Sequence, residues 1–231
     1  MELYPRVKVD YAPTKTPYDG VRFPNLWTAI AAPLEPAPLP GELVDEVEGY
    51  PQASYTGRAA GFLYKQASLW RVRLNHQFQR VKFREGIVNL SHRIFEPALL
   101  RDAIAIFHRA EKGLDREQLN SVMPTYDQMV SRVNDIDSSA PVIVCTDSEE
   151  GLEGFTSRLG DRAHFWTGID RTPKAGDANH FKNAYGVPHV EQVFAQALAI
   201  SRAKHFVHIT SNIATFVLYA NPWMPSSFVH C

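Results

Sequence analysis

Short apolar segments alternate with amphipathic ones from about residue 100 onward, and this alternation constrains the fold more than any other feature. The clearest apolar segment, PVIVCTDS (141–148), has its apolar run behind a proline and ends in polar residues. DAIAIFHR (102–109) and KHFVHITS (204–211) are of the same kind. Between and after these segments, apolar residues recur at the spacing of a helix, at 125–136, 149–160, 191–203 and 212–220. The pattern predicts an α/β fold, a Rossmann-like parallel sheet flanked by helices.

The first hundred residues have a different texture. VKVDY (7–11) alternates as a short strand would, and the proline-dense run PLEPAPLPGE (33–42) predicts a loop or linker. Helical spacing places Trp70, Leu74, Phe78 and Val81 on one face of a further helix. Its arginines and lysine form a solvated basic face or, alternatively, a groove for a phosphorylated or nucleic-acid partner. We therefore expect two domains, 1–100 and 101–231.

Bulk composition restricts the function classes. The 231 residues are 45% hydrophobic and carry a formal net charge of -1, so no general attraction to nucleic acid or an anionic membrane is expected. Two cysteines do not make a disulfide framework. No apolar run approaches the roughly 20 residues of a membrane helix, and no signal peptide is visible. We expect a soluble, cytoplasmic protein without a transmembrane segment.

Polar residues follow three of the expected strands, where parallel sheets bind ligands. Arg109 could bind phosphate with two hydrogen bonds, or form a surface ion pair. Asp147 could accept from a base or ribose, although it or Ser148 could simply cap the next helix. Ser211 and Asn212 could form a phosphate cradle or a capping turn.

Metal and glycine-rich motifs do not contribute to the expected site. HExxH, CxxC, GxGxxG and Walker patterns do not occur. His205 and His208 should lie on opposite faces of a strand. NDID (134–137) has paired acids, but we interpret it as a loop at the amino end of a strand. No metal site is expected.

An ordered series of motifs resembles the GDP-fucose transferases, a family that includes the α-1,6-fucosyltransferases and the rhizobial nodulation fucosyltransferase. The C-terminal motifs are AIFHRAEK (105–112), MPTYDQMV (123–130), VIVCTDSEEGLEGF (142–155) and residues 190–219. VKVDY and PNLWTAIAAPL (24–34) resemble the family's N-terminal stretch. The series covers nearly the whole chain, and its specificity lies in the order rather than in any one motif.

The resemblance implies a GT-B-type enzyme that inverts the sugar anomer and needs neither metal nor cofactor. GDP-fucose would be the nucleotide-sugar donor and a glycan or glycoconjugate the acceptor. Arg109 matches the arginine at the β-phosphate, Asp147 the acid at the guanosine end, and Ser211 and Asn212 the turn over the diphosphate. His108 and Lys112 fall in the same donor motif, and Glu117 or its rival Asp115 would deprotonate the acceptor.

Departures from the family pattern keep two alternatives open. Phe107 replaces the motif's histidine, and Gln196 replaces an acid on the last long helix. The family's first strand, glycine-rich loop and helix precede the point where this sequence begins, so an incomplete N-terminal domain is expected. One alternative is a non-catalytic relative that binds nucleotide weakly at most. The other is an unrelated nucleotide- or phosphate-binding α/β protein.

Overall fold

A computed structural model describes residues 2–4, 7–8, 75, 78–109, 124–173, 187–209 and 211–229. At the amino end, β1 (Glu2–Tyr4) pairs antiparallel with β2 (Val7–Lys8), so part of the expected first strand is present. Residues 9–74 lie outside the described residues, and with them the proline-dense run and most of the helix expected around Trp70.

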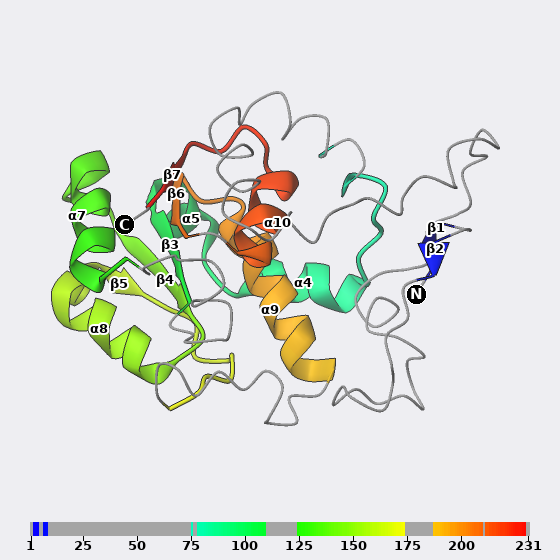
Figure 1. Cartoon of the computed structure of the whole chain (residues 1–231), viewed down its shortest axis with the longest axis horizontal. Helices are drawn as coiled ribbons and strands as arrows, with labels where there is room; N and C mark the ends of the chain where they lie inside the picture. Colours follow the sequence, from blue (N-terminus) through cyan, green and yellow to red (C-terminus); the bar gives the residue numbers. More distant parts are fainter. Residues whose placement is uncertain are drawn as a thin grey trace.

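The main body is a sheet of five parallel strands in the order β5-β4-β3-β6-β7 (Figure 1). Its strands are β3 (Ile104–His108), β4 (Val142–Thr146), β5 (Ala163–His164), β6 (His205–His208) and β7 (Ser226–Phe228). The chain moves outward from β3 to β5, crosses back to β6 beside β3, and continues to β7. This confirms the predicted α/β class with a parallel sheet flanked by helices.

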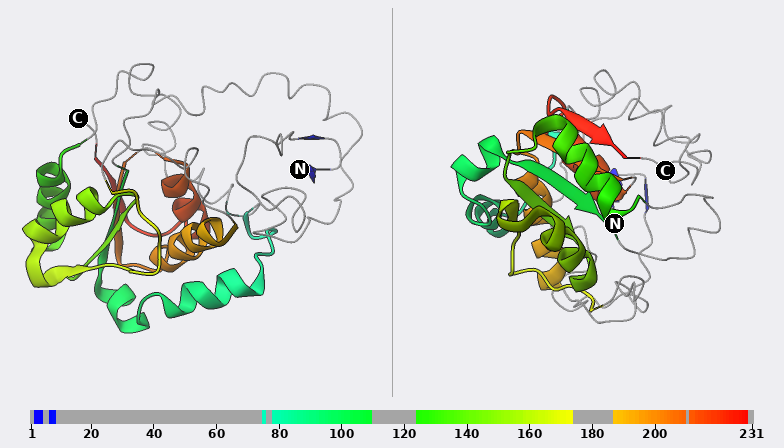
Figure 2. Two further views of the ribbon diagram at one scale, coloured as in Figure 1. Left: turned by 90° about the horizontal axis from the view of Figure 1, so that it is seen from below. Right: turned by 90° about the vertical axis from the view of Figure 1, so that its left-hand side faces the viewer.

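Helices cover both faces of the sheet, so its central strands are buried on both sides (Figure 2). On one face lie α7 (Tyr126–Asp137) and α8 (Glu149–Leu159). On the other lie α9 (Val187–Ile200) and α10 (Asn212–Ala220), with α4 (Glu85–Arg93) packed on α9 and α5 (Pro97–Asp102) nearby. Alternate residues of a strand point to opposite faces, so Ile104 and Ile106 enter the α7–α8 core while Ala105 enters the α9–α10 core.

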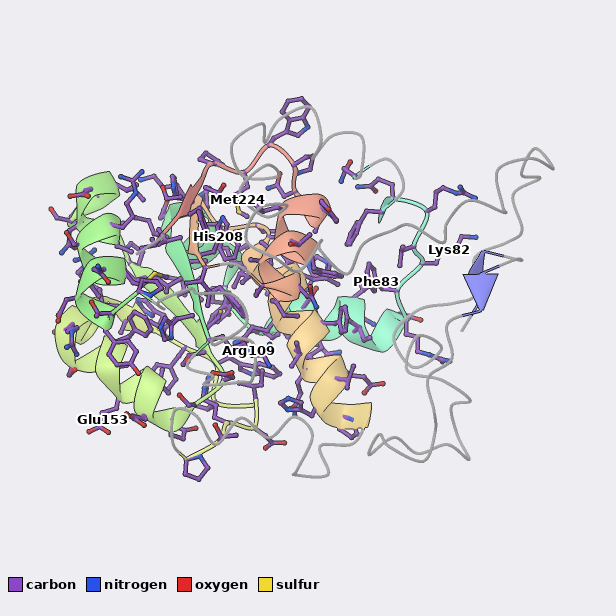
Figure 3. All side chains as sticks on the ribbon, in the orientation of Figure 1. Lys82, Phe83, Arg109, Glu153, His208 and Met224 are labelled. Atoms are coloured by element: carbon purple, nitrogen blue, oxygen red, sulfur yellow. The ribbon has the colours of Figure 1, made fainter. Side chains whose placement is uncertain are left out.

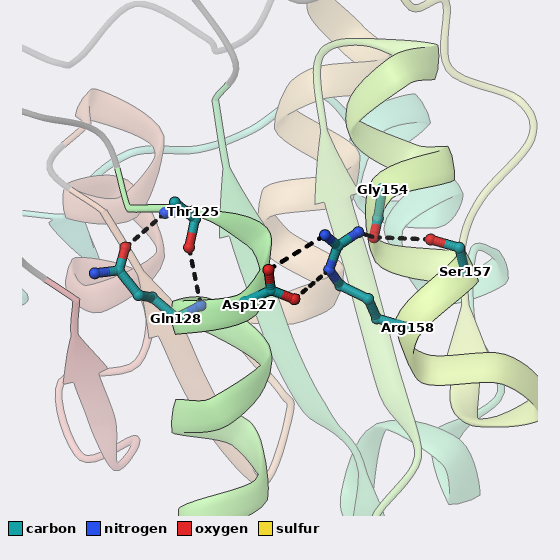
Figure 4. Close-up of polar contacts among 6 residues, drawn as sticks. All are labelled: Thr125, Asp127, Gln128, Gly154, Ser157 and Arg158. Carbon is teal, nitrogen blue, oxygen red and sulfur yellow. Dashed lines mark hydrogen bonds and ion pairs between the residues drawn. The ribbon is translucent and has the colours of Figure 1, made fainter.

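Local sequence explains how the helices begin and end. Thr125 and Gln128 form a capping box at the start of α7, in which each side chain accepts from the other residue's backbone N–H (Figure 4). Gly160 ends α8 as predicted, with φ of 57°, a conformation that favours glycine.

Arg158 on α8 binds Asp127 on α7, with 2.6 Å between Nε and Oδ1, and joins the two helices (Figure 4).

Two sequence interpretations are wrong. NDID (134–137) forms the last turn of α7 rather than a loop, and Asp137 Oδ1 accepts hydrogen bonds from Ser139 and Ala140 immediately after it. The helix expected to carry Val81 does not reach that residue, because Gln79 and Arg80 form a turn after Phe78. The aromatic contact of Phe83 with Phe216, at 5.6 Å between centroids, fixes the non-helical segment against α10.

No helix in the described ranges is long and apolar enough to cross a membrane.

Candidate functional site

The strand order creates one position where connections leave the sheet in opposite directions. From the carboxyl end of β3 the chain enters α7 on one face, whereas from β6 it enters α10 on the other. In doubly wound sheets ligands bind at this switch point, beyond the carboxyl ends of the two strands. Arg109 follows β3, Ser211 follows β6, and Asp147 follows β4 on the other side of β3. The three candidates from sequence therefore share one edge of the sheet.

Arg109 and Asp147 are in direct contact. His108 on β3 is in register with Thr146 on the neighbouring parallel strand β4. The residues that follow them, Arg109 and Asp147, therefore lie side by side. The distance from Arg109 Nε to Asp147 Oδ2 is 3.5 Å, and the side chains are 35% and 19% exposed. Arg109 lies at the end of β3 in Figure 3. This exposure leaves the guanidinium group accessible to an anionic ligand while the carboxylate fixes its position.

The structure separates the two roles considered for Asp147 and Ser148. Ser148 is the N-cap of α8, and its hydroxyl accepts from the backbone N–H of Gly151 at 3.0 Å. The backbone carbonyl of Asp147 accepts from both the N–H and the hydroxyl of Thr172, at 3.0 and 3.1 Å. The Asp147 carboxylate is therefore not the helix cap, and it is directed to Arg109 instead.

Ser211 and Asn212 form the start of α10. The Ser211 hydroxyl accepts from the backbone N–H of Ala214 at 2.9 Å, so this turn is a helix cap, one of the two interpretations considered. Asn212 is the exposed first residue of the helix. A capping serine still has its own O–H to donate, and the first amides of the helix favour an anion. The cap and the cradle are compatible.

Arg171 is a second guanidinium group near this edge that the sequence did not single out. Its side chain is 3% exposed, its Nη2 donates to the carbonyl of Trp166 at 2.7 Å, and its Nη1 lies 3.6 Å from Glu149 Oε1. Burial raises the pKa of the neighbouring Cys145 thiol to about 12, and the charge of Arg171 opposes that shift. The thiol therefore stays protonated and serves as an apolar core group. Arg171 follows an irregular segment after β5. No periodic pattern in the sequence predicts where such a segment places its side chains.

Gln196 lies on the buried side of α9. It is 6% exposed, and its Nε2 has no hydrogen-bond partner within the structure as described. One turn earlier, the buried Oε1 of Gln192 is likewise without one. Buried amide atoms of this kind are uncommon because they lose hydrogen bonds to water without replacement. The helical spacing could have pointed to Gln192, which shares a face with Gln196.

His108 lies on the other face of the sheet from Arg109, as strand alternation predicts. It is 4% exposed and packs against the rings of Tyr126 and Phe155, with centroid distances of 5.2 and 5.4 Å. Its Nε2 lies 3.3 Å from the carbonyl of Pro124. This places His108 in the α7–α8 core, and we leave it out of the site. Phe107 instead packs against the apolar clusters of the sheet.

The remaining sequence candidates, Lys112, Asp115 and Glu117, lie outside the described residues. Within those residues, no group of three or more histidine, cysteine, aspartate or glutamate side chains could hold a metal ion. His205 and His208 project to opposite sides of β6: His205 lies 3.0 Å from the Ser227 hydroxyl, and His208 stacks on Phe206.

Neither protein-family models nor curated protein sequences give a match to this chain. Among solved structures, a crystal structure of POFUT1 in complex with GDP is similar, with a TM-score of 0.41 and 13% sequence identity. The similarity covers 70% of this chain and 50% of POFUT1, so the chain spans about half the length of the solved structure that it matches. A similarity this distant does not establish a family.

Proposed function

We propose that the protein is an inverting, metal-independent glycosyltransferase that transfers fucose from GDP-fucose to a glycan hydroxyl. The observation that carries the proposal is the contact between Arg109 and Asp147 at the switch point of a parallel sheet. The resemblance to the GDP-fucose transferases assigns Arg109 to the β-phosphate, and the contact brings Asp147 beside Arg109, so that Asp147 would lie near the phosphates rather than at the guanosine end. The capped start of α10 supplies a third group at the same edge.

The proposed reaction is a single displacement at the anomeric carbon. The acceptor oxygen forms a bond to that carbon as the bond to the β-phosphate oxygen breaks, and GDP leaves with the electron pair. The guanidinium group of Arg109 would neutralise the charge that develops on the leaving diphosphate. The acceptor's proton would pass to a carboxylate, assigned from the family resemblance to Glu117 or Asp115.

Calorimetric titration of the purified chain with GDP, UDP and ADP tests the donor site. We expect selective GDP binding that weakens by at least about tenfold, or 1.4 kcal/mol, in Arg109→Ala. Arg158→Ala is the matched control, since it removes a guanidinium group paired with an acid on the opposite face of the sheet. Selective binding of ADP, or a folded protein that binds no nucleotide, would overturn the proposal.

A second candidate is a relative that keeps the fold and at most weak nucleotide binding but transfers no sugar. Phe107 favours it, because an apolar ring packed into the clusters of the sheet stands where the family motif has a polar side chain. Fucose transfer from GDP-fucose to a glycan acceptor, followed through release of GDP, separates the two candidates. Release that requires an acceptor excludes the non-catalytic one.

A further inference from the structure

The segment that follows β5 returns to the side of β4 at Thr172. The pairing of β5 with β4 ends at His164, and Thr172 then rejoins the chain of β4 through an isolated parallel bridge to Ser148. The backbone N–H of Thr172 donates to the carbonyl of Asp147 at 3.0 Å, and its own carbonyl accepts from the N–H of Glu149 at 2.8 Å. These two hydrogen bonds clasp the turn between β4 and α8, which carries Asp147.

The hydroxyl group of Thr172 makes a second contact with the same carbonyl. Its Oγ1 donates to the Asp147 carbonyl oxygen at 3.1 Å, so this oxygen accepts from the N–H and the hydroxyl of one residue. Thr172 is 5% exposed, and burial of a hydroxyl is unfavourable unless it is hydrogen-bonded. Two donors on one oxygen restrict the rotation of that peptide group, and hence the direction of the Asp147 side chain.

Arg171 anchors the same segment to α8. Its side chain is 3% exposed, its Nη2 donates to the carbonyl of Trp166 at 2.7 Å, and its Nη1 lies 3.6 Å from Glu149 Oε1. A buried charge is unfavourable without hydrogen bonds and an opposite charge, which favours the one arrangement that supplies both. Thr172, the next residue, is therefore held in place beside the turn.

From these contacts we infer that Thr172 is a positioning residue for the pair of Arg109 and Asp147. Thr172 holds the peptide group of Asp147, and the Asp147 carboxylate lies 3.5 Å from Arg109 Nε. The inference rests on the proposed function, because it concerns the direction of Arg109 toward the donor's diphosphate. A guanidinium group that is directed in advance loses less conformational freedom when it binds an anion.

Calorimetric titration with GDP tests the inference. Thr172→Val removes the hydroxyl but keeps the shape and the backbone N–H, and it should weaken GDP binding about fivefold, the usual effect of one hydrogen bond. Thr172→Ser keeps the hydroxyl and should bind GDP within about twofold of the wild type. Thr156→Val is the matched control on α8, because it removes a hydroxyl that donates to the carbonyl of Glu153, and it should leave the affinity unchanged.

The same substitution in an Asp147→Ala protein separates positioning from a general structural effect. Without the carboxylate there is no side chain to direct, so Thr172→Val should then change the affinity for GDP by less than about 1.5-fold. Its effect on stability, measured by urea denaturation, should remain in both backgrounds, because the backbone carbonyl of residue 147 is present in each.

Two outcomes would overturn the inference. One is a folded Thr172→Val protein that binds GDP like the wild type, and the other is an equal loss of affinity with and without the Asp147 side chain. If Thr172→Val does not fold, Thr172→Ala gives the same comparison, because alanine also removes the hydroxyl and adds no bulk. If GDP binding depends on Arg109 but not on Thr172, only the positioning role fails. If GDP does not bind at all, the proposed function fails with it.

Discussion

At the scale of single residues, Ser211 shows how one side chain can serve both the fold and the proposed site. Its hydroxyl caps α10 by accepting from Ala214 N–H, and the same group lies beyond the carboxyl end of β6. Ser211→Ala should lower the free energy of unfolding by about 1 kcal/mol, the usual effect of losing a cap. Urea denaturation measures this loss.

Ser211→Asp separates the cap from the cradle. Aspartate caps as well as serine, so stability should stay close to that of the wild type. Its negative charge would lie near the donor phosphates, however, and GDP should bind about tenfold more weakly. A stable Ser211→Asp protein that binds GDP with wild-type affinity would show that Ser211 does not face the diphosphate.

The pair of Arg109 and Asp147 contributes to the molecule differently. Both side chains are partly exposed, and exposed ion pairs add little to stability. Their substitutions should therefore affect ligand binding more than folding. Sequence reasoning reached both residues through one rule, that parallel strands end in ligand-binding loops. It did not reach Arg171, because that side chain is placed by an irregular segment rather than by a periodic element.

At the scale of elements, close contact between α7 and α8 depends on a glycine. A Cβ added at Gly154 would lie 2.5 Å from the Tyr126 ring, which is held in turn by Phe155. Gly154→Ala should therefore destabilise the protein by about 1–3 kcal/mol despite alanine's better helix propensity. Gly86 on α4 has nothing within 4 Å of the same position, so Gly86→Ala should stabilise by about 0.5 kcal/mol. Urea denaturation of both variants checks the contrast, and effects of the same sign would contradict it.

The amino end of β6 should make stability depend on pH. Burial, together with the charges of Arg132 and Lys204, lowers the pKa of His205 below its ordinary 6.5. As the pH falls below that value, the unfolded chain binds a proton that the folded chain does not. The free energy of unfolding should therefore decrease between about pH 7.5 and 5.5, a window above the carboxylate titrations.

His205→Gln tests this assignment because it removes the titrating ring and keeps a polar partner for Ser227. Unfolding in urea at the two pH values should show a smaller decrease for the variant than for the wild type. Equal decreases in both proteins would mean that other histidines cause the pH dependence.

The elements also show where sequence patterns carry information. β3 and β4 are buried on both faces and therefore form continuous apolar runs, which made them easy to predict. β5 and β7 are edge strands of only two and three residues, and each contains at least one polar side chain, so no apolar run marks them. α10 was predicted with its correct ends, whereas α9 begins and ends earlier than its apolar spacing suggested. Tertiary packing, rather than local propensity, determines those limits.

At the scale of the whole molecule, the strand order explains why residues far apart in sequence can form one site. β3 lies between β4 and β6, so groups following the three strands meet at one edge although about 100 residues separate the first from the last. The alternation of strands and helices predicted the parallel sheet but not its order. The strand order depends on which face of the sheet each connecting helix covers. That in turn depends on how the apolar surfaces of α7, α8, α9 and α10 pack together on the two faces.

The molecule as proposed neutralises the donor's diphosphate with its own cation. If Arg109 supplies that charge, the affinity for GDP measured with magnesium and with EDTA should agree within about twofold. Arg109→Lys should bind GDP about tenfold more weakly in both conditions, because an ammonium group keeps the charge but not the two parallel N–H donors. The variant controls for charge, and EDTA controls for the divalent ion. Loss of GDP binding in EDTA by the wild-type protein would instead assign charge neutralisation to a metal ion and leave Arg109 with an orienting role.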